Sequence, residues 1–350
     1  MIPIHLLDGG LGTSLEDKYH VKFSPENPLW SSDLLITSPD TLRACQSDFA
    51  QVPVDILLTA TYQVSLEAFA RTRAPNHADG IPPAKVPQYL DLAVSIAERV
   101  KAPTAQVALS LGPYGATMIP STEYSGHYDM GHSSADQLLG WHQKRLRVFC
   151  QIDRLNSRIS YLAFETVPRL DEIVAIRQLI ASLPHPDLGM SALNRTPYWI
   201  SCVFPGDGYT LPDGSTVDQV VNTMLSSKYL GSPPWGIGIN CTKIGKLSRL
   251  VQLYEAAVSR LSNTGETTIW PSLVLYPDGT NGEIYDTVSK TWRVSDSSCT
   301  GQTSPWERQL AAVVTDARTQ GHWRSIVVGG CCKATHVDIS RLRSALPQES

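Results

Sequence analysis

Three cysteines stand where the sequence could build a metal site. Cys331 and Cys332 are adjacent and follow two glycines at the end of an apolar run, and Cys241 comes at the end of an earlier run of the same kind. Three thiolate ligands with an open fourth position are typical of a catalytic zinc site, and soft sulfur ligands favour Zn²⁺ over Mg²⁺ or Ca²⁺. Free cysteine is also among the most buried residue types, so spacing alone leaves metal binding and simple packing both open.

A second chemistry is open to the adjacent pair. Cys331 or Cys332 would act as a covalent nucleophile if a base, usually histidine, activated its sulfur. His336 is the histidine nearest to the pair in sequence, and the pattern does not fix its position in the fold. The other histidines near predicted chemistry, His127, His132 and His142, are expected to be surface or loop residues.

The residues that could do chemistry follow short apolar runs, which are the predicted strands. Successive residues in these runs are β-branched or apolar, as in strands that are buried on both faces of a parallel sheet. The predicted strands are Ile4–Leu7, Ile56–Thr59, Gln106–Ser110, Tyr161–Phe164, Trp199–Phe204, Gly236–Asn240, Thr268–Leu275 and Ser325–Val328. Amphipathic patterns between them predict helices over Asp40–Gln51, Val86–Val100, Ser134–Asn156, Leu170–Ser182, Thr216–Ser226, Lys246–Leu261, Pro305–Gln320 and Asp338–Ala345.

This alternation favours a (β/α)8 TIM barrel that uses the whole chain, 1–350, as a single domain. A doubly wound open sheet is the alternative, but no Gly-x-Gly-x-x-Gly pattern with a later acidic residue follows the first strand. Chemistry in such barrels lies at the C-terminal ends of the strands. The sixth and eighth strands end two positions apart around the rim, so Cys241 can approach Cys331 and Cys332 there.

Composition limits the class of partner. The chain carries 29 Lys and Arg against 33 Asp and Glu, a net charge of −4, which leaves no basic excess for a nucleic-acid backbone. Lys144, Arg145 and Arg147 form a small basic cluster whose helical pattern predicts a solvated face. No apolar run is long enough to cross a membrane, and the seven cysteines, an odd number, do not suggest a disulfide framework. We therefore expect reduced thiols and a cytoplasmic protein with no nucleic-acid or membrane partner.

Six short motifs occur in a characteristic order along the chain. They are Asp8–Thr13, Thr61–Gln63, Gly112–Ala116, Glu165–Thr166, Gly238–Cys241 and Gly329–Cys332. From about Leu7 to Cys332 the chain resembles the homocysteine S-methyltransferases, which include betaine- and S-methylmethionine-dependent enzymes. The Gly-Gly-Cys-Cys element with the earlier Asn-Cys is the most specific part of this likeness. The resemblance implies a barrel with zinc on Cys241, Cys331 and Cys332, and homocysteine held by its amino-acid end at Glu165 and the Asp8–Gly10 turn.

The expected reaction follows from this resemblance and from thiol chemistry. A thiol is mostly protonated at neutral pH, and zinc would hold the thiol of L-homocysteine as a thiolate that can attack a small methylated cation. We expect S-methylmethionine as the donor, S-adenosylmethionine as the second choice, and methionine as the product. Tyr114 and Tyr124 are candidates for an aromatic contact with the donor.

Smaller roles are expected for residues beside these. Asn240 would hydrogen-bond the substrate or a cysteine sulfur, and the backbone N–H groups of Gly9 and Gly10 would face a carboxylate. Two features depart from the family pattern: the second-strand motif Leu58–Gln63, and the long Tyr276–Ser304 connection, which holds Cys299. Because both lie where substrates could bind, a non-catalytic thiol- or zinc-binding barrel that has lost donor turnover is the alternative function. The oligomeric state is left open.

Overall fold

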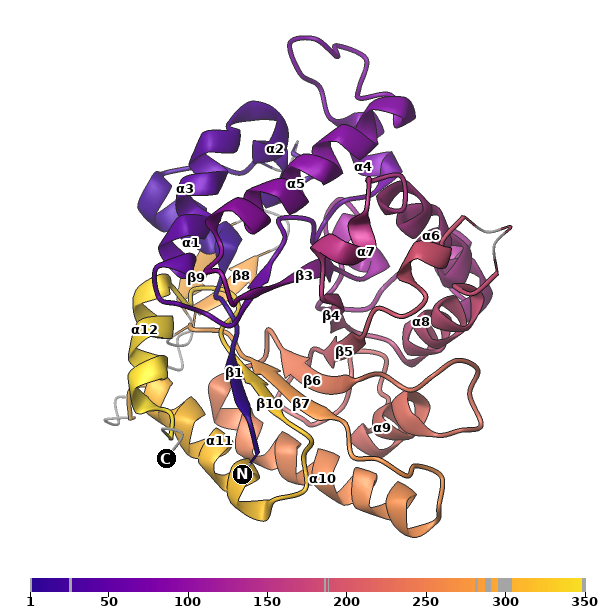
Figure 1. Cartoon of the computed structure of the whole chain (residues 1–350), viewed down its shortest axis with the longest axis vertical. Helices are drawn as coiled ribbons and strands as arrows, with labels where there is room; N and C mark the ends of the chain where they lie inside the picture. Colours follow the sequence, from indigo (N-terminus) through magenta and orange to yellow (C-terminus); the bar gives the residue numbers. More distant parts are fainter. Residues whose placement is uncertain are drawn as a thin grey trace.

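Eight parallel strands form one sheet at the centre of the computed structural model (Figure 1). The structure describes residues 2–24, 27–185, 187, 189–280, 283–286, 291–294 and 304–347. The eight strands are β1 (Ile4–Leu6), β2 (Ile56–Leu58), β3 (Gln106–Leu111), β4 (Tyr161–Val167), β5 (Tyr198–Cys202), β6 (Gly236–Asn240), β7 (Ser272–Tyr276) and β10 (Ile326–Val328). Each one overlaps a predicted strand.

The sheet closes on itself as a barrel. Its order is β1-β10-β7-β6-β5-β4-β3-β2, and a parallel bridge between Leu7 and Ile56 joins the two outer strands. Two carboxylates reinforce this seam: Asp55 accepts a hydrogen bond from the Leu6 N–H (2.7 Å), and Asp8 accepts one from the Leu58 N–H (2.9 Å). The TIM-barrel prediction is therefore confirmed, and the doubly wound alternative is wrong.

The strands are apolar at successive positions because they separate two cores. The side chains that fill the barrel interior are Leu7, Ile56, Ala108, Ala163, Trp199, Val274, Tyr276 and Val327. The intervening residues, such as Leu57, Leu109 and Ile200, pack outward against the helices. A strand with both faces buried reads as a continuous apolar run, as the sequence does.

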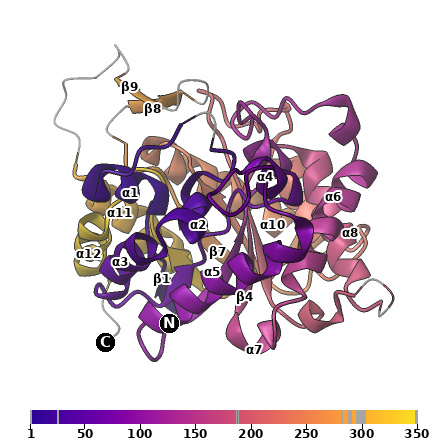
Figure 2. The ribbon, with the colours of Figure 1, turned by 90° about the horizontal axis from the view of Figure 1, so that it is seen from above.

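Helices surround the sheet (Figures 1 and 2). They are α1 (Leu11–Tyr19), α2 (Leu34–Thr37), α3 (Pro39–Ala50), α4 (Leu66–Arg71), α5 (Val86–Val100), α6 (Ala135–Phe149), α7 (Leu155–Arg158), α8 (Leu170–Ser182), α9 (Val217–Leu225), α10 (Leu247–Asn263), α11 (Trp306–Gln320) and α12 (His336–Ala345). Helix α1 was not predicted, because its first residues belong to a glycine-rich motif. The helix predicted over Ser134–Asn156 is two helices, since Arg154 has a left-handed φ of 51° just before α7.

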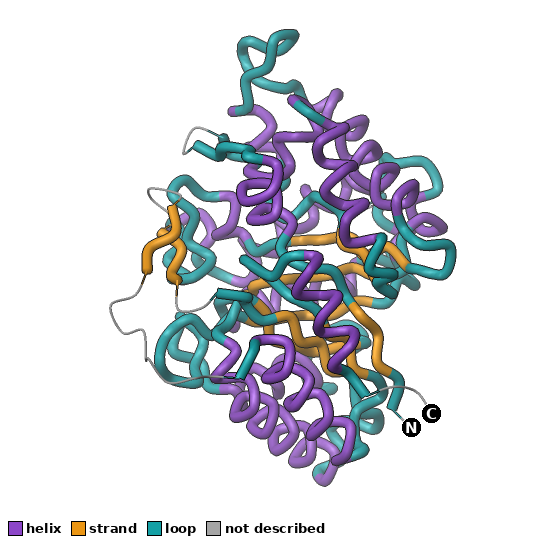
Figure 3. Tube along the Cα trace, turned by 90° about the vertical axis from the view of Figure 1, so that its left-hand side faces the viewer, coloured by secondary structure: helices purple, strands orange, loops and turns teal. Residues whose placement is uncertain are grey.

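The long connection after β7 contains a hairpin that the sequence patterns did not predict. Strands β8 (Glu283–Asp286) and β9 (Thr291–Val294) pair antiparallel, and Figures 2 and 3 show them apart from the barrel strands. Cys299 lies outside the described residues. None of the described helices is both long and apolar enough to cross a membrane.

Candidate active site and metal centre

A cavity of about 290 Å³ lies at the C-terminal ends of the barrel strands. Its floor, as we use the term, consists of residues at or just after strand ends that face this cavity: Asp8, Glu165, Asn240, Cys241, Cys331 and Cys332. Its wall is the connection between β3 and α6, residues 112–133, of which Glu123 and Tyr124 line the cavity. All three cysteines singled out in the sequence, together with Asp8, Gly9, Gly10, Glu165 and Asn240, therefore surround one space.

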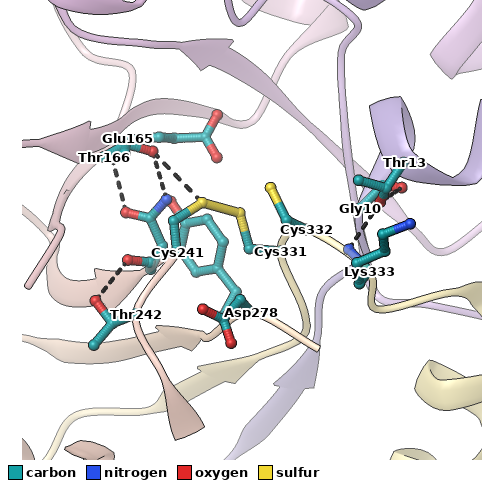
Figure 4. The surroundings of a disulfide bond; sticks show 12 residues. Gly10, Thr13, Glu165, Thr166, Cys241, Thr242, Asp278, Cys331, Cys332 and Lys333 are labelled. Atoms are coloured by element: carbon teal, nitrogen blue, oxygen red, sulfur yellow. Dashed lines mark hydrogen bonds between the residues drawn. A yellow bond between two sulfur atoms is a disulfide. The ribbon is translucent and has the colours of Figure 1, made fainter. Parts of the chain in front are cut away.

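The three floor cysteines converge although they come from two strands. Their sulfur atoms all lie within 4.8 Å of one another (Figure 4). Cys241 and Cys331 form a disulfide with an S–S distance of 2.13 Å, and Cys332 is a free thiol. The expectation that every cysteine is a thiol is thus wrong for this pair. The same convergence that suits a metal also brings two sulfurs within bonding reach, so the disulfide must be reduced before both can act as thiolate ligands.

The sulfur set fits a zinc ion once it is reduced. Zinc–sulfur bonds of about 2.3 Å place two ligands of a tetrahedral site about 3.8 Å apart. The three sulfurs lie within 4.8 Å of one another, so the Cys241 and Cys331 sulfurs would have to move apart after reduction. The adjoining cavity leaves space for a further ligand beside the cysteines. Three thiolates and an open position match the soft, open site predicted from the sequence.

Unusual backbone conformations orient the floor. Thr166, Cys241 and Lys333 have left-handed φ values of 58°, 46° and 63°, and each adjoins or is a floor residue. Asn240 holds this arrangement: its Oδ1 accepts from the Thr166 N–H (2.8 Å), and its Nδ2 donates to the Thr166 hydroxyl (2.7 Å). The Thr166 hydroxyl in turn lies 3.9 Å from the Cys241 sulfur. Non-glycine residues adopt such φ values at a cost that surrounding bonds must offset, and such residues often mark functional sites.

The glycines of the two glycine-rich motifs serve close packing. A Cβ on Gly329 would lie 2.6 Å from the Asp8 carbonyl oxygen, and one on Gly10 would lie 2.4 Å from the Cys331 carbonyl oxygen. Neither glycine has a left-handed φ, so close packing, and not a turn that favours glycine, accounts for both residues. The Gly10 N–H donates to the Ala334 carbonyl (2.9 Å), which means that it is already engaged and does not point to a substrate carboxylate.

Two floor residues, Asp8 and Glu165, have buried carboxyl groups. Asp8 and Glu165 are each only 4% exposed. Burial raises the pKa of Asp8 to about 8, with the nearby Glu165 charge adding to the rise, and burial raises the pKa of Glu165 to about 7. The Ser110 hydroxyl donates to Glu165, whereas Asp8 Oδ1 has no hydrogen-bond partner among the described residues. Because burial penalises the charged form, a bound ammonium group would stabilise both carboxylates.

Tyr124, and not Tyr114, reaches the cavity. The Tyr124 hydroxyl lies 3.9 Å from the Cys332 sulfur. The Tyr114 ring stacks on His132 at 3.8 Å, and its hydroxyl hydrogen-bonds Asp129. Tyr114 is absent from the cavity lining formed by the described residues, so the structure does not place it with the other predicted site residues. Its backbone N–H, by contrast, is used to anchor the wall.

A buried charged cluster lies behind the wall. Glu172 of α8 is fully buried and accepts hydrogen bonds from the Tyr114 N–H (2.8 Å) and the Tyr128 hydroxyl (2.5 Å), and it pairs with His142 Nε2 at 3.0 Å. Arg145 donates to the Gly112 carbonyl (2.8 Å) and contacts His142. The expectations of a surface His142 and a solvated Arg145 are therefore wrong. Helix α6 instead turns both side chains inward, where Arg145 holds Gly112 and His142 pairs with Glu172, the acceptor for the Tyr114 N–H and the Tyr128 hydroxyl.

Three further residues line the cavity to which the sequence patterns assigned no role. Glu123 and Trp30 lie in connections away from any strand end, so the strand-end rule does not reach them. Tyr62 belongs to a quoted motif, and its side chain lines the cavity near the Trp30 ring, with the two ring centres 6.4 Å apart. No histidine lines the cavity within the described part of the chain, and burial raises the pKa of Cys332 to about 12. The covalent-nucleophile hypothesis thus lacks both a base and an activated thiol.

Comparison with known proteins gives one consistent family. The model of the homocysteine S-methyltransferase family matches residues 5–346. Homocysteine S-methyltransferase of Escherichia coli is 29% identical over 97% of this chain and 94% of that protein. Homocysteine S-methyltransferase YbgG of Bacillus subtilis is 26% identical over 97% of this chain and 93% of that protein.

Solved structures agree with this match. The homocysteine methyltransferase MmuM of Escherichia coli in its metallated form has a TM-score of 0.65 and 26% identity, covering 97% of this chain and 96% of that chain. Its oxidized form has a TM-score of 0.67 and 25% identity, covering 97% and 95%. With the barrel, the convergent cysteines and the motif order, these likenesses show that the chain is an enzyme that belongs to the homocysteine S-methyltransferase family.

Proposed function

We propose that this enzyme uses zinc to transfer a methyl group from a sulfonium donor to the thiol of L-homocysteine. S-methylmethionine is the proposed donor, with S-adenosylmethionine as the second choice, and methionine is the product. The observation that carries the proposal is the meeting of three cysteine sulfurs and two buried carboxylates around one cavity. We further propose that the whole chain is one homocysteine-binding domain and that it works in the cytoplasm, where its cysteines are kept reduced.

The floor residues divide into those for the metal and those for the amino-acid end of homocysteine. Cys241, Cys331 and Cys332 would hold the ion. When bound, zinc supplies the positive charge that keeps a coordinated thiol deprotonated. Asp8 and Glu165 would bind the homocysteine ammonium, because two buried carboxylates with raised pKa values gain most from a cation. Asn240 holds Thr166, which follows Glu165 and whose hydroxyl lies 3.9 Å from the Cys241 sulfur.

The proposed transfer is a direct displacement. The thiol of homocysteine first releases its proton to solvent. An electron pair of its sulfur then forms a bond to the donor methyl carbon while the bond from that carbon to the donor sulfur breaks, and the donor leaves as a neutral thioether. With S-methylmethionine both products are methionine. The protein mainly has to align donor and acceptor, and orientation of this kind lowers a barrier by several kcal/mol.

Aromatic rings favour a cationic donor. Trp30, Tyr62 and Tyr124 line the same cavity as the cysteines. Ring faces attract a sulfonium or quaternary ammonium through their negative quadrupole. Of the two predicted tyrosines, Tyr124 is the one proposed for this role, since it lines the cavity and Tyr114 does not.

Metal content and methionine formation test the proposal together. Protein reduced with a phosphine and supplied with zinc should retain about one ion per chain and form methionine from homocysteine when each donor is offered separately. Cys241→Ala and Cys331→Ala should lose the ion and the activity, whereas Cys150→Ala, a half-buried cysteine at the end of α6, should retain both. Full activity of a metal-free preparation would refute zinc dependence. Homocysteine binding without turnover of any donor would instead support the non-catalytic alternative.

A further inference from the structure

A third buried carboxyl group lines the cavity, and it comes from the wall and not from the end of a barrel strand. Asp8 and Glu165 come from the ends of barrel strands, whereas Glu123 belongs to the wall and is 5% exposed. The proposed binding of one homocysteine ammonium uses only the two floor carboxylates. Glu123 is thus a buried carboxyl group of the cavity lining that lies outside the proposed homocysteine contacts.

Glu123 lies on the Cys332 side of the cavity. Its neighbour Tyr124 places its hydroxyl 3.9 Å from the Cys332 sulfur. Glu123, Tyr62, Tyr124 and Cys332 all line the same cavity. Glu123 therefore shares this part of the cavity with two aromatic rings and a proposed metal ligand.

The wall fixes Glu123 in this place. The Thr122 N–H donates to the Gly115 carbonyl (2.9 Å), and the Gly126 N–H donates to the Thr122 carbonyl (2.8 Å). A Cβ on Gly115 would lie 3.0 Å from the Glu123 nitrogen, so the chain is closely packed on both sides of this residue. Glu172 and Arg169 anchor the segment that follows, through the Tyr128 hydroxyl (2.5 Å) and the Gly126 carbonyl (3.0 Å). Because the backbone around Glu123 is fixed, its carboxyl group can favour a substrate that places a cation beside it.

The kind of cation that suits Glu123 follows from hydrogen-bond chemistry. A sulfonium or a quaternary ammonium has no N–H group and is attracted mainly by aromatic faces, which Tyr62 and Tyr124 supply. A carboxylate gains most from an ammonium, because it accepts charge-assisted N–H hydrogen bonds. The cavity lining has both aromatic rings and the Glu123 carboxylate, so it suits a donor molecule that carries both a sulfonium and an ammonium.

We propose that Glu123 binds the α-ammonium group of the methyl donor and thereby selects sulfonium amino acids over donors that lack an amino group. This inference rests on the proposed methyl transfer. It names the class of donor from a residue: S-methylmethionine and S-adenosylmethionine have the required ammonium, whereas betaine does not. Glu123 is a specificity residue, which touches the donor away from the methyl group that moves.

A pair of donors that differ only in the amino group tests the inference. S-methylmethionine is compared with 4-dimethylsulfoniobutanoate, which keeps the sulfonium and the carboxylate and lacks the α-amino group. Zinc-loaded wild-type enzyme should prefer S-methylmethionine by about 10- to 100-fold in kcat/KM, as expected for a hydrogen bond between charged groups. Glu123→Gln should remove this preference by raising the KM for S-methylmethionine, with kcat, zinc content and the KM for homocysteine within about twofold of wild type.

Matched variants keep the test clear. Asp129→Asn removes an acidic group from the same wall without altering the cavity lining and should keep the preference. Glu123→Asp keeps the carboxylate and should retain part of the preference for S-methylmethionine. This variant also provides the test if Glu123→Gln folds poorly. Calorimetric titration of S-methylmethionine without homocysteine should show the same loss of affinity in Glu123→Gln. A wild-type preference near one, or an unchanged preference in Glu123→Gln, would overturn the role of Glu123. Failure of wild-type enzyme to use any sulfonium donor would instead refute the proposed function itself.

Discussion

The floor and the wall of the cavity face the same space but are held in place differently. Floor residues such as Glu165 and Cys241 sit at strand ends, so the register of the barrel and a few strained turns set their positions. The wall is a long connection whose ends are tied by Glu172, His142 and Arg145, side chains from helices behind it. The comparison indicates that the proposed metal and homocysteine contacts would depend on the sheet, whereas the proposed donor contacts would depend on a buried charged cluster.

The largest effect should come from breaking the cluster behind the wall. Glu172→Ala leaves His142, Tyr128 and the Tyr114 N–H without their acceptor and should lower the free energy of unfolding by about 3–5 kcal/mol. Urea unfolding of the reduced protein measures this change. Asp153→Ala, which removes an exposed ion pair with Arg154, is the control and should leave the unfolding midpoint in place. If Glu172→Ala were as stable as Asp153→Ala, the buried cluster would not be what holds the wall in place.

Homocysteine binding should respond next, through the floor. Glu165→Gln keeps the shape of the side chain and a hydrogen bond with Ser110 but loses the charge. Because a charged hydrogen bond contributes about 1.5–3 kcal/mol, the KM for homocysteine should rise about 10- to 150-fold. The KM for S-methylmethionine should change far less. Equal increases for both substrates in steady-state assays would show that floor and wall do not divide the substrates.

The floor should also make homocysteine use depend on pH. The raised pKa values, about 8 for Asp8 and about 7 for Glu165, mean that both groups gain protons as the pH falls below these values. Only the ionised forms attract an ammonium, so kcat/KM for homocysteine should rise from pH 6 to about pH 8.5. Glu165→Gln should lose part of this rise in a pH series. A wild-type profile that is flat over this range would contradict the proposed roles of the two carboxylates.

The same shifts make an opposite prediction for stability. Between the ordinary pKa of a carboxyl group, about 4, and the raised values, the folded protein binds more protons than the unfolded chain. The contribution of Asp8 and Glu165 to the free energy of unfolding therefore falls as the pH rises from about 4.5 to 8. Urea unfolding across this range should show a shallower decline in Glu165→Gln than in wild type. An identical slope in the two proteins would argue against the raised pKa of Glu165.

The smallest effect is expected at Tyr114. Tyr114→Phe removes a hydroxyl that bonds Asp129 on the outer side of the wall, so kinetic constants for both substrates should stay within about twofold of wild type. Tyr124→Ala, which removes a ring from the cavity, should raise the KM for the donor by more. Steady-state assays with both variants decide between the two tyrosines. A larger effect at Tyr114 would restore the sequence-based expectation.

The contrast between the floor and the wall also explains what the sequence could predict. In a (β/α)8 barrel the functional residues lie at the C-terminal ends of the strands, so the strand count alone predicted that Cys241 lies near Cys331 and Cys332. The disulfide between two of them left no trace in the sequence, because the same residues suit a metal. The wall follows no such rule, so the sequence offered both Tyr114 and Tyr124 and could not show which of them lines the cavity.

A usable signal for the buried cluster did exist in α6. His142 and Arg145 are three residues apart and lie at helical spacing from Leu138, Trp141 and Phe149, which are all buried. Two polar residues on the apolar face of a helix predict a buried polar partner. The identity of that partner, Glu172 on the next long helix, could not be read from the sequence, because packing between helices is not encoded in their spacing.

The seam of the barrel gives Asp8 a second task. One of its oxygens accepts the Leu58 N–H across the join between β1 and β2, and the other is turned to the cavity with no partner among the described residues. Burial raises the pKa of Asp8 to about 8, and an ammonium bound beside it would favour the ionised form, which is the stronger acceptor for the Leu58 amide. We therefore expect bound homocysteine to strengthen this hydrogen bond and to slow hydrogen exchange of the Leu58 amide, at the join between β1 and β2 that a single bridge closes.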